Sequence, residues 1–188
     1  MIDRKIVLLS KSPRRSQLLR EAGFNFEVQT KDVDESYPAE LKTDKIAEYI
    51  SEKKAAAGEE FLTENNCVLT ADTIVVFNNS VYEKPVDKAD AVRILKTLSG
   101  QTHTVITGVT IRTKEKQQSF SDQSQVTFAS LSDEEIDYYL ETCKPYDKAG
   151  AYGIQEWIGH CKILKMEGSY TNIMGLPVHR VYEEMSKL

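Results

Sequence analysis

A short apolar run that leads at once into a helix start constrains the fold of this chain more than any other feature. Residues 6–9 read Ile-Val-Leu-Leu, which is typical of a strand buried on both faces. Ser12-Pro13 then predicts a helix N-terminus, with Ser12 as the N-cap and Pro13 at the first helical position. Gly23 is expected to end that helix. This segment is therefore predicted to form a strand, a turn and a helix.

Strands and helices are predicted to alternate along the rest of the chain, without a strict repeat of strand, helix and strand. Residues 113–124 are polar and are expected to connect two strands. The 188 residues suit one domain or two closely joined lobes, and the pattern predicts a mixed-sheet α/β protein. Further strands are expected over 24–30, 67–77, 102–112, 125–129 and 161–166, and helices over 43–57, over 89–98, after a capping box at residues 132–135, and over 178–187.

The charge balance directs attention to small anionic ligands. Lys and Arg total 24 and Asp and Glu total 29, which gives a formal net charge of −5. A protein that binds duplex nucleic acid normally gathers a basic excess, so this class is disfavoured. An acidic chain can still bind an anion in a focused local site. A small phosphorylated ligand is therefore the expected partner, and nucleic acid is not.

Cysteine usage and the absence of long apolar runs predict a cytoplasmic protein. The chain has three cysteines and no CxxC pair, which indicates neither a disulfide framework nor a zinc knuckle. The apolar run near the N-terminus is shorter than the roughly 7–15 residues of a signal peptide core. No run approaches the roughly 18 residues of a membrane helix, so no membrane association is expected. The three histidines lack metal-ligand spacing and are expected to be non-catalytic.

Ser10, Ser12, Arg14 and Arg15 surround the predicted helix start and could form an anion site. A helix N-terminus exposes unpaired backbone N–H groups and carries partial positive charge. Arg adds bidentate binding of phosphate oxygens. The alternative is that Ser12 only caps the helix while both arginines are solvated. A third interpretation, a minor-groove DNA motif, conflicts with the acidic net charge.

Asp72 is the first candidate for the chemistry itself. It precedes the apolar run of residues 74–77, and a carboxylate beside a buried strand is costly unless it is paired or binds a metal. Asp72 could bind Mg²⁺, which prefers oxygen ligands, or could deprotonate a water molecule. The alternative is a turn aspartate that accepts hydrogen bonds from nearby backbone N–H groups.

Several lysines and one glutamine could contact a phosphorylated ligand. Lys54 continues the stripe of Ile46 and Ile50 at four-residue steps, so it is expected to point inward in preference to Lys53. Lys84 and Lys148 each lie beside a residue that bends the chain, and Gln155 follows a glycine-rich stretch. A glutamine can both donate and accept hydrogen bonds, which suits recognition of a base edge. Taken one at a time, each lysine is more typical of a solvated surface.

Taken together, these segments resemble the Maf family of nucleoside triphosphate pyrophosphatases. They occur in the family's order and span nearly the whole chain, which makes them far more specific than any one string. The matching strings are Ser10-Lys11-Ser12-Pro13-Arg14-Arg15, Ala71-Asp72-Thr73, Glu83-Lys84-Pro85, Ser99-Gly100-Gln101-Thr102-His103, the run from Asp147 to Gln155, and Gly168-Ser169-Tyr170.

The resemblance implies a fold, a reaction and a cofactor. The fold would be a long mixed β-sheet flanked by helices, with two lobes around a central cleft as in Maf and ITPase proteins, formed by one domain over residues 1–188. The reaction would be hydrolysis of dTTP and UTP, with modified pyrimidine nucleotides as a further option, to the monophosphate and pyrophosphate. This is a house-cleaning activity on the nucleotide pool, and it would require Mg²⁺ or Mn²⁺.

The resemblance also assigns roles to individual residues. Asp72 resembles the catalytic proton acceptor, and Asp72 and Glu35 are the expected metal ligands; whether Asp72 is base or ligand stays open. Arg14, Thr73 and Gln155 match the specificity positions of the branch that acts on dTTP and UTP. The expected catalytic residues are Asp72, Lys54 and Lys84, and the expected substrate-binding residues are Ser10, Ser12, Arg14, Arg15, Thr73, Lys148 and Gln155.

One further interpretation remains beside the pyrophosphatase and the nucleic-acid-binding protein that the net charge of −5 disfavours. The chain could be a nucleotide-binding regulator of cell division and septum formation that does not need turnover. Asp72 together with Lys54 and Lys84 favours an enzyme, because binding alone needs no carboxylate that activates water. The predicted partner is a nucleoside triphosphate, and a homodimer is left open.

Overall fold

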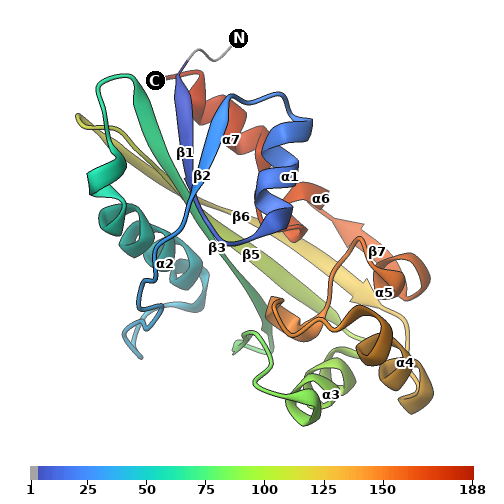
Figure 1. Ribbon diagram of the computed structural model, residues 1–188. Coiled ribbons are helices and arrows are strands. Elements are labelled where there is room, and N and C mark those ends of the chain that lie inside the picture. The colour runs from blue at the N-terminus through green and yellow to red at the C-terminus, as the bar shows by residue number, and fades with distance from the viewer. Residues whose placement is uncertain (1–3) are drawn as a thin grey trace. The chain divides into compact units, whose positions relative to one another are not determined.

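The computed structural model describes residues 4–188, and Figure 1 shows its helices and strands. None of the helices in this range has the length and apolar character needed to cross a membrane. The strands are β1 (Lys5–Leu9), β2 (Phe26–Gln29), β3 (Asn66–Phe77), β4 (Ser80–Tyr82), β5 (Thr102–Arg112), β6 (Gln117–Phe128) and β7 (Ile163–Glu167). The helices are α1 (Pro13–Glu21), α2 (Thr43–Ala57), α3 (Lys88–Leu98), α4 (Asp133–Cys143), α5 (Trp157–Cys161), α6 (Tyr170–Ile173) and α7 (Val178–Met185), with 3₁₀ turns η1 (Glu59–Phe61) and η2 (Ala149–Ala151).

The described strands form one mixed sheet, which confirms the predicted α/β class. Its order is β2-β1-β3-β5-β6-β7, and β4 pairs with β3. The pairs of β1 with β2 and with β3 are parallel, whereas β3 with β4 and β6 with β7 are antiparallel. The predictions for residues 43–57 and 102–112 match α2 and β5 at both ends.

Two differences between the predicted and the observed elements have a clear physical reason. Residues 113–124 are not merely a polar connection, because β6 already begins at Gln117. Strand β6 lies next to β5 in the sheet, and this pairing extends it beyond the residues whose own side chains favour a strand. The strand expected from Cys161 begins at Ile163, because residues 157–161 form the short helix α5. Five residues are too few to show a helical period in the sequence.

The chain divides into two compact units, in agreement with the prediction of two lobes. Unit 1 comprises Met1–Thr73, Thr107–Asp122 and Gly175–Leu188, of which residues 4 onward are described. Unit 2 comprises Ile74–Ile106 and Gln123–Met174. Strands β3, β5 and β6 each contribute residues to both units.

Unit 1 places helix α2 directly against strand β5. An added Cβ at Gly108 would lie 2.2 Å from the carbonyl carbon of Ala47 and 2.2 Å from the nitrogen of Glu48. Only glycine permits this approach of helix backbone to strand. Ile46, Ala47 and Ile50 are buried on α2, as their spacing predicts. The close packing fixes the position of the helix that carries Lys54.

Unit 2 contains a large apolar core. Helix α3 contacts α4, and α4 contacts α5 (Figure 1). The predicted capping box at the start of α4 is present, with Ser132 and Glu135 each bonding the other's backbone. Residues of this core include Ala91, Ile94, Leu95, Leu98, Val126, Phe128, Ile136, Tyr139, Leu140, Tyr152 and Ile158.

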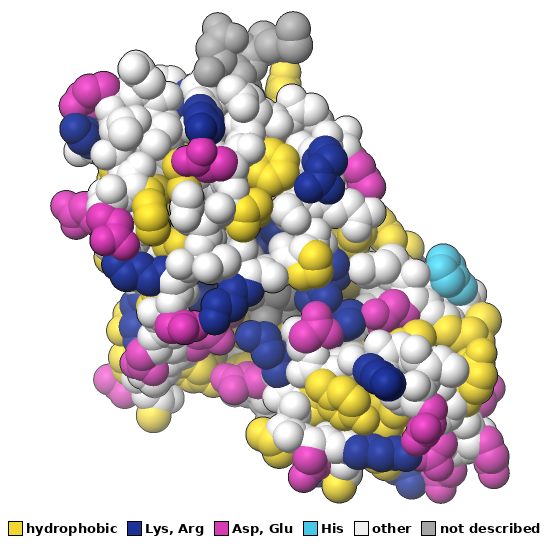
Figure 2. All heavy atoms as spheres, viewed as in Figure 1, with side chains coloured by type: hydrophobic (Ala, Val, Ile, Leu, Met, Phe, Trp, Pro, Cys, Tyr) yellow, Lys and Arg dark blue, Asp and Glu magenta, His cyan; other side chains and the backbone are white. Residues whose placement is uncertain are grey.

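Acidic and basic side chains are mixed over the face drawn in Figure 2. Exposed ion pairs of the described residues include Lys5 with Glu27 at 2.6 Å and Lys31 with Glu60 at 2.9 Å. Exposed pairs contribute about 0–1 kcal/mol each, so they do not decide the fold. The ion pairs formed by Lys54 and by Lys148 are partly buried, so they are stronger candidates for a functional role.

Candidate functional site

The segment from Ser10 to Arg15 forms the turn between β1 and α1 in unit 1. Ser12 is the N-cap and Pro13 begins the helix, as predicted, but the Ser12 side chain makes no capping hydrogen bond within the described chain. The Ser10 hydroxyl instead accepts a hydrogen bond from the Ser12 backbone N–H at 3.1 Å. Arg14 lies in the first turn of α1 and is half-buried. The two serines and both arginines therefore belong to one helix start.

Arg15 binds three parts of unit 1 at once. Its Nε donates to the Gly175 carbonyl oxygen at 2.8 Å, and its Nη2 donates to the Thr73 hydroxyl at 3.2 Å. Its Nη1 donates to the Ser10 hydroxyl at 3.4 Å. Burial lowers the pKa of the Arg15 guanidinium, and the charge of Asp72 partly offsets that shift. Arg15 is therefore an internal tie between Ser10 and Thr73 as well as a candidate phosphate ligand.

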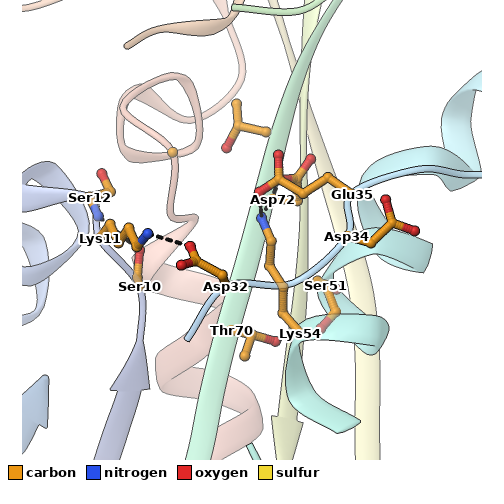
Figure 3. A network of polar contacts seen from close by, with 12 residues as sticks. Ser10, Lys11, Ser12, Asp32, Asp34, Glu35, Ser51, Lys54, Thr70 and Asp72 are labelled. Carbon is orange, nitrogen blue, oxygen red and sulfur yellow. Dashed lines mark hydrogen bonds and ion pairs between the residues drawn. The ribbon is translucent and has the colours of Figure 1, made fainter. Parts of the chain in front are cut away.

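Lys54 brings two candidate carboxylates together in unit 1 (Figure 3). Its Nζ lies 2.7 Å from Oδ1 of Asp72 and 2.8 Å from Oε1 of Glu35. Lys54 comes from α2, Asp72 from β3 and Glu35 from the loop that precedes α2. The prediction that Lys54 points inward is confirmed. Three residues that are distant in sequence thus meet at one ammonium group.

The neighbouring Lys53 has a different partner. Its Nζ lies 3.1 Å from Oδ2 of Asp34, which is exposed. The pKa of Asp34 is lowered to about 2, mainly because Ser36 donates hydrogen bonds to its carboxylate, and Lys53 adds to the shift. In the same loop, Asp32 pairs with Lys11 (Figure 3). The acidic loop is therefore tied to lysines at several points, and Lys53 does not take the place of Lys54 beside Asp72.

In unit 2, Lys148 binds two carboxylates. Its Nζ lies 2.7 Å from Oδ1 of Asp147 and 3.0 Å from Oε1 of Glu156. The other Glu156 oxygen, Oε2, accepts a hydrogen bond from the Tyr139 hydroxyl. Sequence reasoning did not single out Glu156 or Tyr139. A carboxylate directly after Gln155 was visible in the sequence, but its contact with α4 was not.

The segments around Lys84 and Lys148 are also joined in unit 2. The backbone N–H of Gly150 donates to the carbonyl oxygen of Glu83 at 3.2 Å. Lys84 follows β4 and is exposed. Two of the motifs that carry the family resemblance are therefore in direct contact through their backbones.

Gln155 has an unsatisfied polar atom. Its Oε1 is buried and has no hydrogen-bond partner within residues 4–188. A buried amide oxygen without a partner is costly, and such atoms call for a ligand, a water or a functional role. The amide can accept at Oε1 and donate at Nε2, which suits the edge of a nucleobase.

His103 is a buried structural residue of unit 2. Its Nε2 lies 2.8 Å from the Tyr152 hydroxyl, and its ring packs edge-on against Phe128. Burial lowers the pKa of His103 to about 4, so the ring is neutral at pH 7. This role suits the expectation that His103 takes no part in catalysis.

No cluster of three or more His, Cys, Asp or Glu residues that could hold a metal ion is found within residues 4–188. The Asp72 and Glu35 pair is the candidate donor set in unit 1, because both carboxylates contact the same ammonium. Mg²⁺ is often bound through only one or two protein carboxylates, with phosphate oxygens of the substrate completing the set.

The family model and the sequence relatives match nearly the whole chain. The family model described as Maf-like protein matches residues 5–188. A dTTP/UTP pyrophosphatase of Porphyromonas gingivalis is 50% identical over 184 residues, which cover 96% of this chain and 92% of the relative. A dTTP/UTP pyrophosphatase of Phocaeicola vulgatus is 51% identical over 185 residues, which cover 98% and 96%. Among solved structures, the Staphylococcus aureus Ham1 protein matches with a TM-score of 0.49 and 14% identity over 67% of this chain and 72% of that chain.

Proposed function

The chain belongs to the family described as Maf-like protein, and on that premise we propose that it hydrolyses dTTP and UTP to the monophosphate and pyrophosphate. Three relatives named dTTP/UTP pyrophosphatase are 49 to 51% identical to it. The observation that carries the proposal is the contact of Lys54 with Asp72 at 2.7 Å, beside Glu35. A carboxylate that can activate water thus lies next to a cation that can stabilise negative charge.

The proposed reaction is attack of water on the α-phosphorus. The new bond joins the water oxygen to that phosphorus, and the bond from the phosphorus to the bridging oxygen breaks. Pyrophosphate leaves with the bonding electron pair, and the water proton passes to Asp72. Charge develops on the leaving group, so positioned cations contribute most where that charge appears. Lys54 is the proposed source of this stabilisation in unit 1.

A divalent cation, Mg²⁺ or Mn²⁺, is the proposed cofactor. The residues fit it, because the carboxylates of Asp72 and Glu35 already surround one positive group at 2.7 and 2.8 Å. Oxygen donors of this kind are those that Mg²⁺ and Mn²⁺ prefer. When bound, the metal would stabilise negative charge on the phosphate oxygens. In that state Asp72 and Glu35 would hold the metal.

The remaining candidates divide into phosphate-binding and base-reading residues. We propose that Ser10, Ser12, Arg14 and Arg15 bind phosphate oxygens in unit 1, where a helix start favours anions. Arg15 keeps N–H donors for this task, since its contacts to Ser10, Thr73 and Gly175 use three of its five. We further propose that Lys84 and Lys148 of unit 2 bind phosphate.

Gln155 is the proposed reader of the base, with Thr73 and Arg14 as further specificity residues. Uracil and thymine both present an N3–H donor beside carbonyl acceptors, whereas cytosine has an unprotonated acceptor at N3. The buried Oε1 of Gln155 lacks a partner within residues 4–188 and can accept from N3–H. A site with such a group rejects a base that leaves the amide unpaired.

We propose that this activity clears nucleotides from the cytoplasmic pool.

The test is a panel of canonical and modified nucleoside triphosphates, assayed for pyrophosphate with Mg²⁺, with Mn²⁺ and with a chelator. Pyrophosphate is expected as the first phosphate product, with dTTP and UTP hydrolysed most efficiently. Orthophosphate as the first product, or full activity in chelator, would contradict the mechanism. Nucleotide binding without turnover would support the cell-division regulator instead.

A further inference from the structure

Glu156 of unit 2 uses both of its carboxylate oxygens inside the fold. Oε1 lies 3.0 Å from the Lys148 ammonium, and Oε2 accepts a hydrogen bond from the Tyr139 hydroxyl. The side chains of Lys148 and Glu156 are only 10% and 19% exposed. A carboxylate of this kind is expensive to desolvate unless both oxygens are satisfied, and here both are. Its geometry is therefore set by the protein.

The Tyr139 hydroxyl donates one hydrogen bond and accepts another, and the roles in each bond are fixed. Burial, strengthened by the adjacent Glu156 carboxylate, raises the pKa of the Tyr139 hydroxyl, so the group stays protonated and donates to Glu156. The same oxygen accepts the backbone N–H of Gly153 at 3.0 Å. The resulting chain runs from Gly153 N–H through Tyr139 to Glu156, which also binds Lys148. These hydrogen bonds connect the Gly153 backbone, which precedes Gln155, to the Glu156 carboxylate, which follows it.

Gln155 lies within a turn of residues 153–156, and the hydrogen bonds through Tyr139 hold the two ends of this turn together. The Glu156 N–H donates to the Gly153 carbonyl oxygen at 3.1 Å, so residues 153–156 form a tight turn. An added Cβ at Gly153 would lie 2.7 Å from the Glu156 carboxyl carbon, so the carboxylate rests directly on the glycine. Tyr139 therefore binds both ends of the turn, one through the Gly153 backbone and one through the Glu156 side chain. Rotation of the turn would also rotate the Gln155 amide.

We propose that Glu156 is a positioning residue for base discrimination, a role that rests on the pyrimidine specificity proposed above. Its carboxylate holds the turn of residues 153–156 to Tyr139 on one side and to Lys148 on the other. The Gln155 amide is thereby kept in the orientation that accepts N3–H of uracil or thymine. Glu156 itself contacts neither base nor reacting atoms. The same carboxylate also fixes the direction of Lys148, a proposed phosphate ligand.

The experiment replaces Glu156 by an amide of the same size. In Glu156→Gln, the carbonyl oxygen can accept from only one side, and the NH₂ group opposes the other donor, either Lys148 or Tyr139. The measured quantity is the ratio of kcat/KM for UTP to kcat/KM for CTP. This ratio is expected to fall by about 10-fold, the effect of weakening one hydrogen bond to the base. Glu141→Gln, on the same helix as Tyr139, is the matched control and should leave the ratio unchanged, because Glu141 is exposed and pairs with Lys88 at the surface.

A second variant separates positioning from stability. Tyr139→Phe removes the hydroxyl between Gly153 and Glu156 but leaves the Glu156 pair with Lys148 in place. It should lower the same ratio, and the double variant should lower it no further than the larger single change, because both act through one network. Thermal unfolding identifies folded variants, and Tyr139→Phe decides the outcome if Glu156→Gln does not fold.

Three outcomes are distinguishable in this series. A lower UTP to CTP ratio in the folded variants supports the positioning role. An unchanged ratio in them, even with a proportional loss of activity on both substrates, overturns it and leaves a structural role only. If the wild-type protein itself releases no pyrophosphate from UTP, or does not prefer UTP to CTP, the proposed function fails, and the positioning role falls with it.

Discussion

A mostly buried lysine in each unit binds two carboxylates, and the comparison of these two groups separates reaction from positioning. Lys54 of unit 1 contacts the mostly buried Asp72 and the more exposed Glu35. Lys148 of unit 2 contacts the mostly buried Glu156 and the more exposed Asp147. In both groups a partly buried ammonium is compensated by one inner and one outer carboxylate. Their chemistry is nearly the same, so their surroundings must decide their tasks.

The inner carboxylates differ in what they bind. Glu156 uses one oxygen for Lys148 and the other for the Tyr139 hydroxyl, and it lies on a turn whose backbone the same tyrosine holds. Asp72 lies on strand β3 and meets Lys54 through Oδ1. A carboxylate held at both oxygens by donors of the protein is suited to positioning its neighbours. We expect Asp72 to act on water and Glu156 to act through Gln155.

The largest expected effect comes from Asp72→Asn, which tests the reactive side of the comparison. Turnover should fall by about 10²–10⁴, because the amide can neither accept the proton of water nor bind a metal as a carboxylate does. The loss should be similar for UTP and CTP, unlike the change in selectivity expected for Glu156→Gln. Steady-state pyrophosphate release measures it, with Asp34→Asn as a control on an exposed carboxylate. Near-normal turnover in a folded Asp72→Asn protein would remove Asp72 from the chemistry.

Lys54→Gln should give the next largest effect. Turnover should fall by about 10²-fold, since the ammonium stabilises developing negative charge in a partly desolvated site. Lys53→Gln, one residue earlier, is the matched control and should change turnover by no more than about 2-fold, because its pair with Asp34 is at the surface. The same pyrophosphate assay compares the two. Equal losses at both positions would show that the contact with Asp72 carries no special role.

Gly108→Ala tests how unit 1 holds Lys54 in place. The new Cβ would lie 2.2 Å from the backbone of α2, so the helix must move away from β5. This displacement should lower the free energy of unfolding by about 3 kcal/mol. Chemical denaturation measures the loss. Gly58→Ala, at the end of the same helix, meets the Leu9 and Val68 side chains at 3.0 and 3.1 Å and should cost less. Equal stability of the two variants would contradict the proposed close packing.

The smallest expected effect is a pH dependence of the unfolding free energy that arises from His103 in unit 2. The pKa of His103 is lowered by burial to about 4 from an ordinary 6.5, so the unfolded chain takes up its proton first as the pH falls. The stability that neutral His103 provides is complete above pH 6.5 and is lost as the pH falls toward 4. Between pH 7 and pH 5, the wild-type unfolding free energy should fall by about 2 kcal/mol more than that of His103→Gln. A parallel decrease in both proteins would show that His103 does not titrate in this way.

Features that depend on residues close together in the sequence were predictable from the sequence. The apolar run of residues 6–9 became β1, and the apolar stripe of residues 43–57 became α2. The turn after β3 follows from Asn78 and Asn79, which have φ angles of +48° and +62°. Residues 117–124 were missed as part of β6, because strand β5 supplies the pairing that their polar side chains do not favour alone.

The candidate site was predictable only as a set of residue types. The four-residue spacing of Ile46, Ile50 and Lys54 correctly placed Lys54 on the inner face of α2. The spacing could not show that Asp72 and Glu35 meet at its ammonium, because the three residues lie on separate elements. Glu156 was missed for the same reason, since its partners Tyr139 and Lys148 precede it by 17 and 8 positions.

The sequence by itself determined the alternation of elements, the helix starts, and the inventory of carboxylates, lysines and amides from which a phosphate site could be built. Periodicity, caps and turn residues act over a few positions, so their consequences can be read along the chain. The tertiary structure decided which charged groups share an environment: Lys54 with Asp72 and Glu35, and Lys148 with Glu156 and Tyr139. Electrostatic and hydrogen-bond energies depend on distance and burial in space, and these are set by how sheet and helices pack.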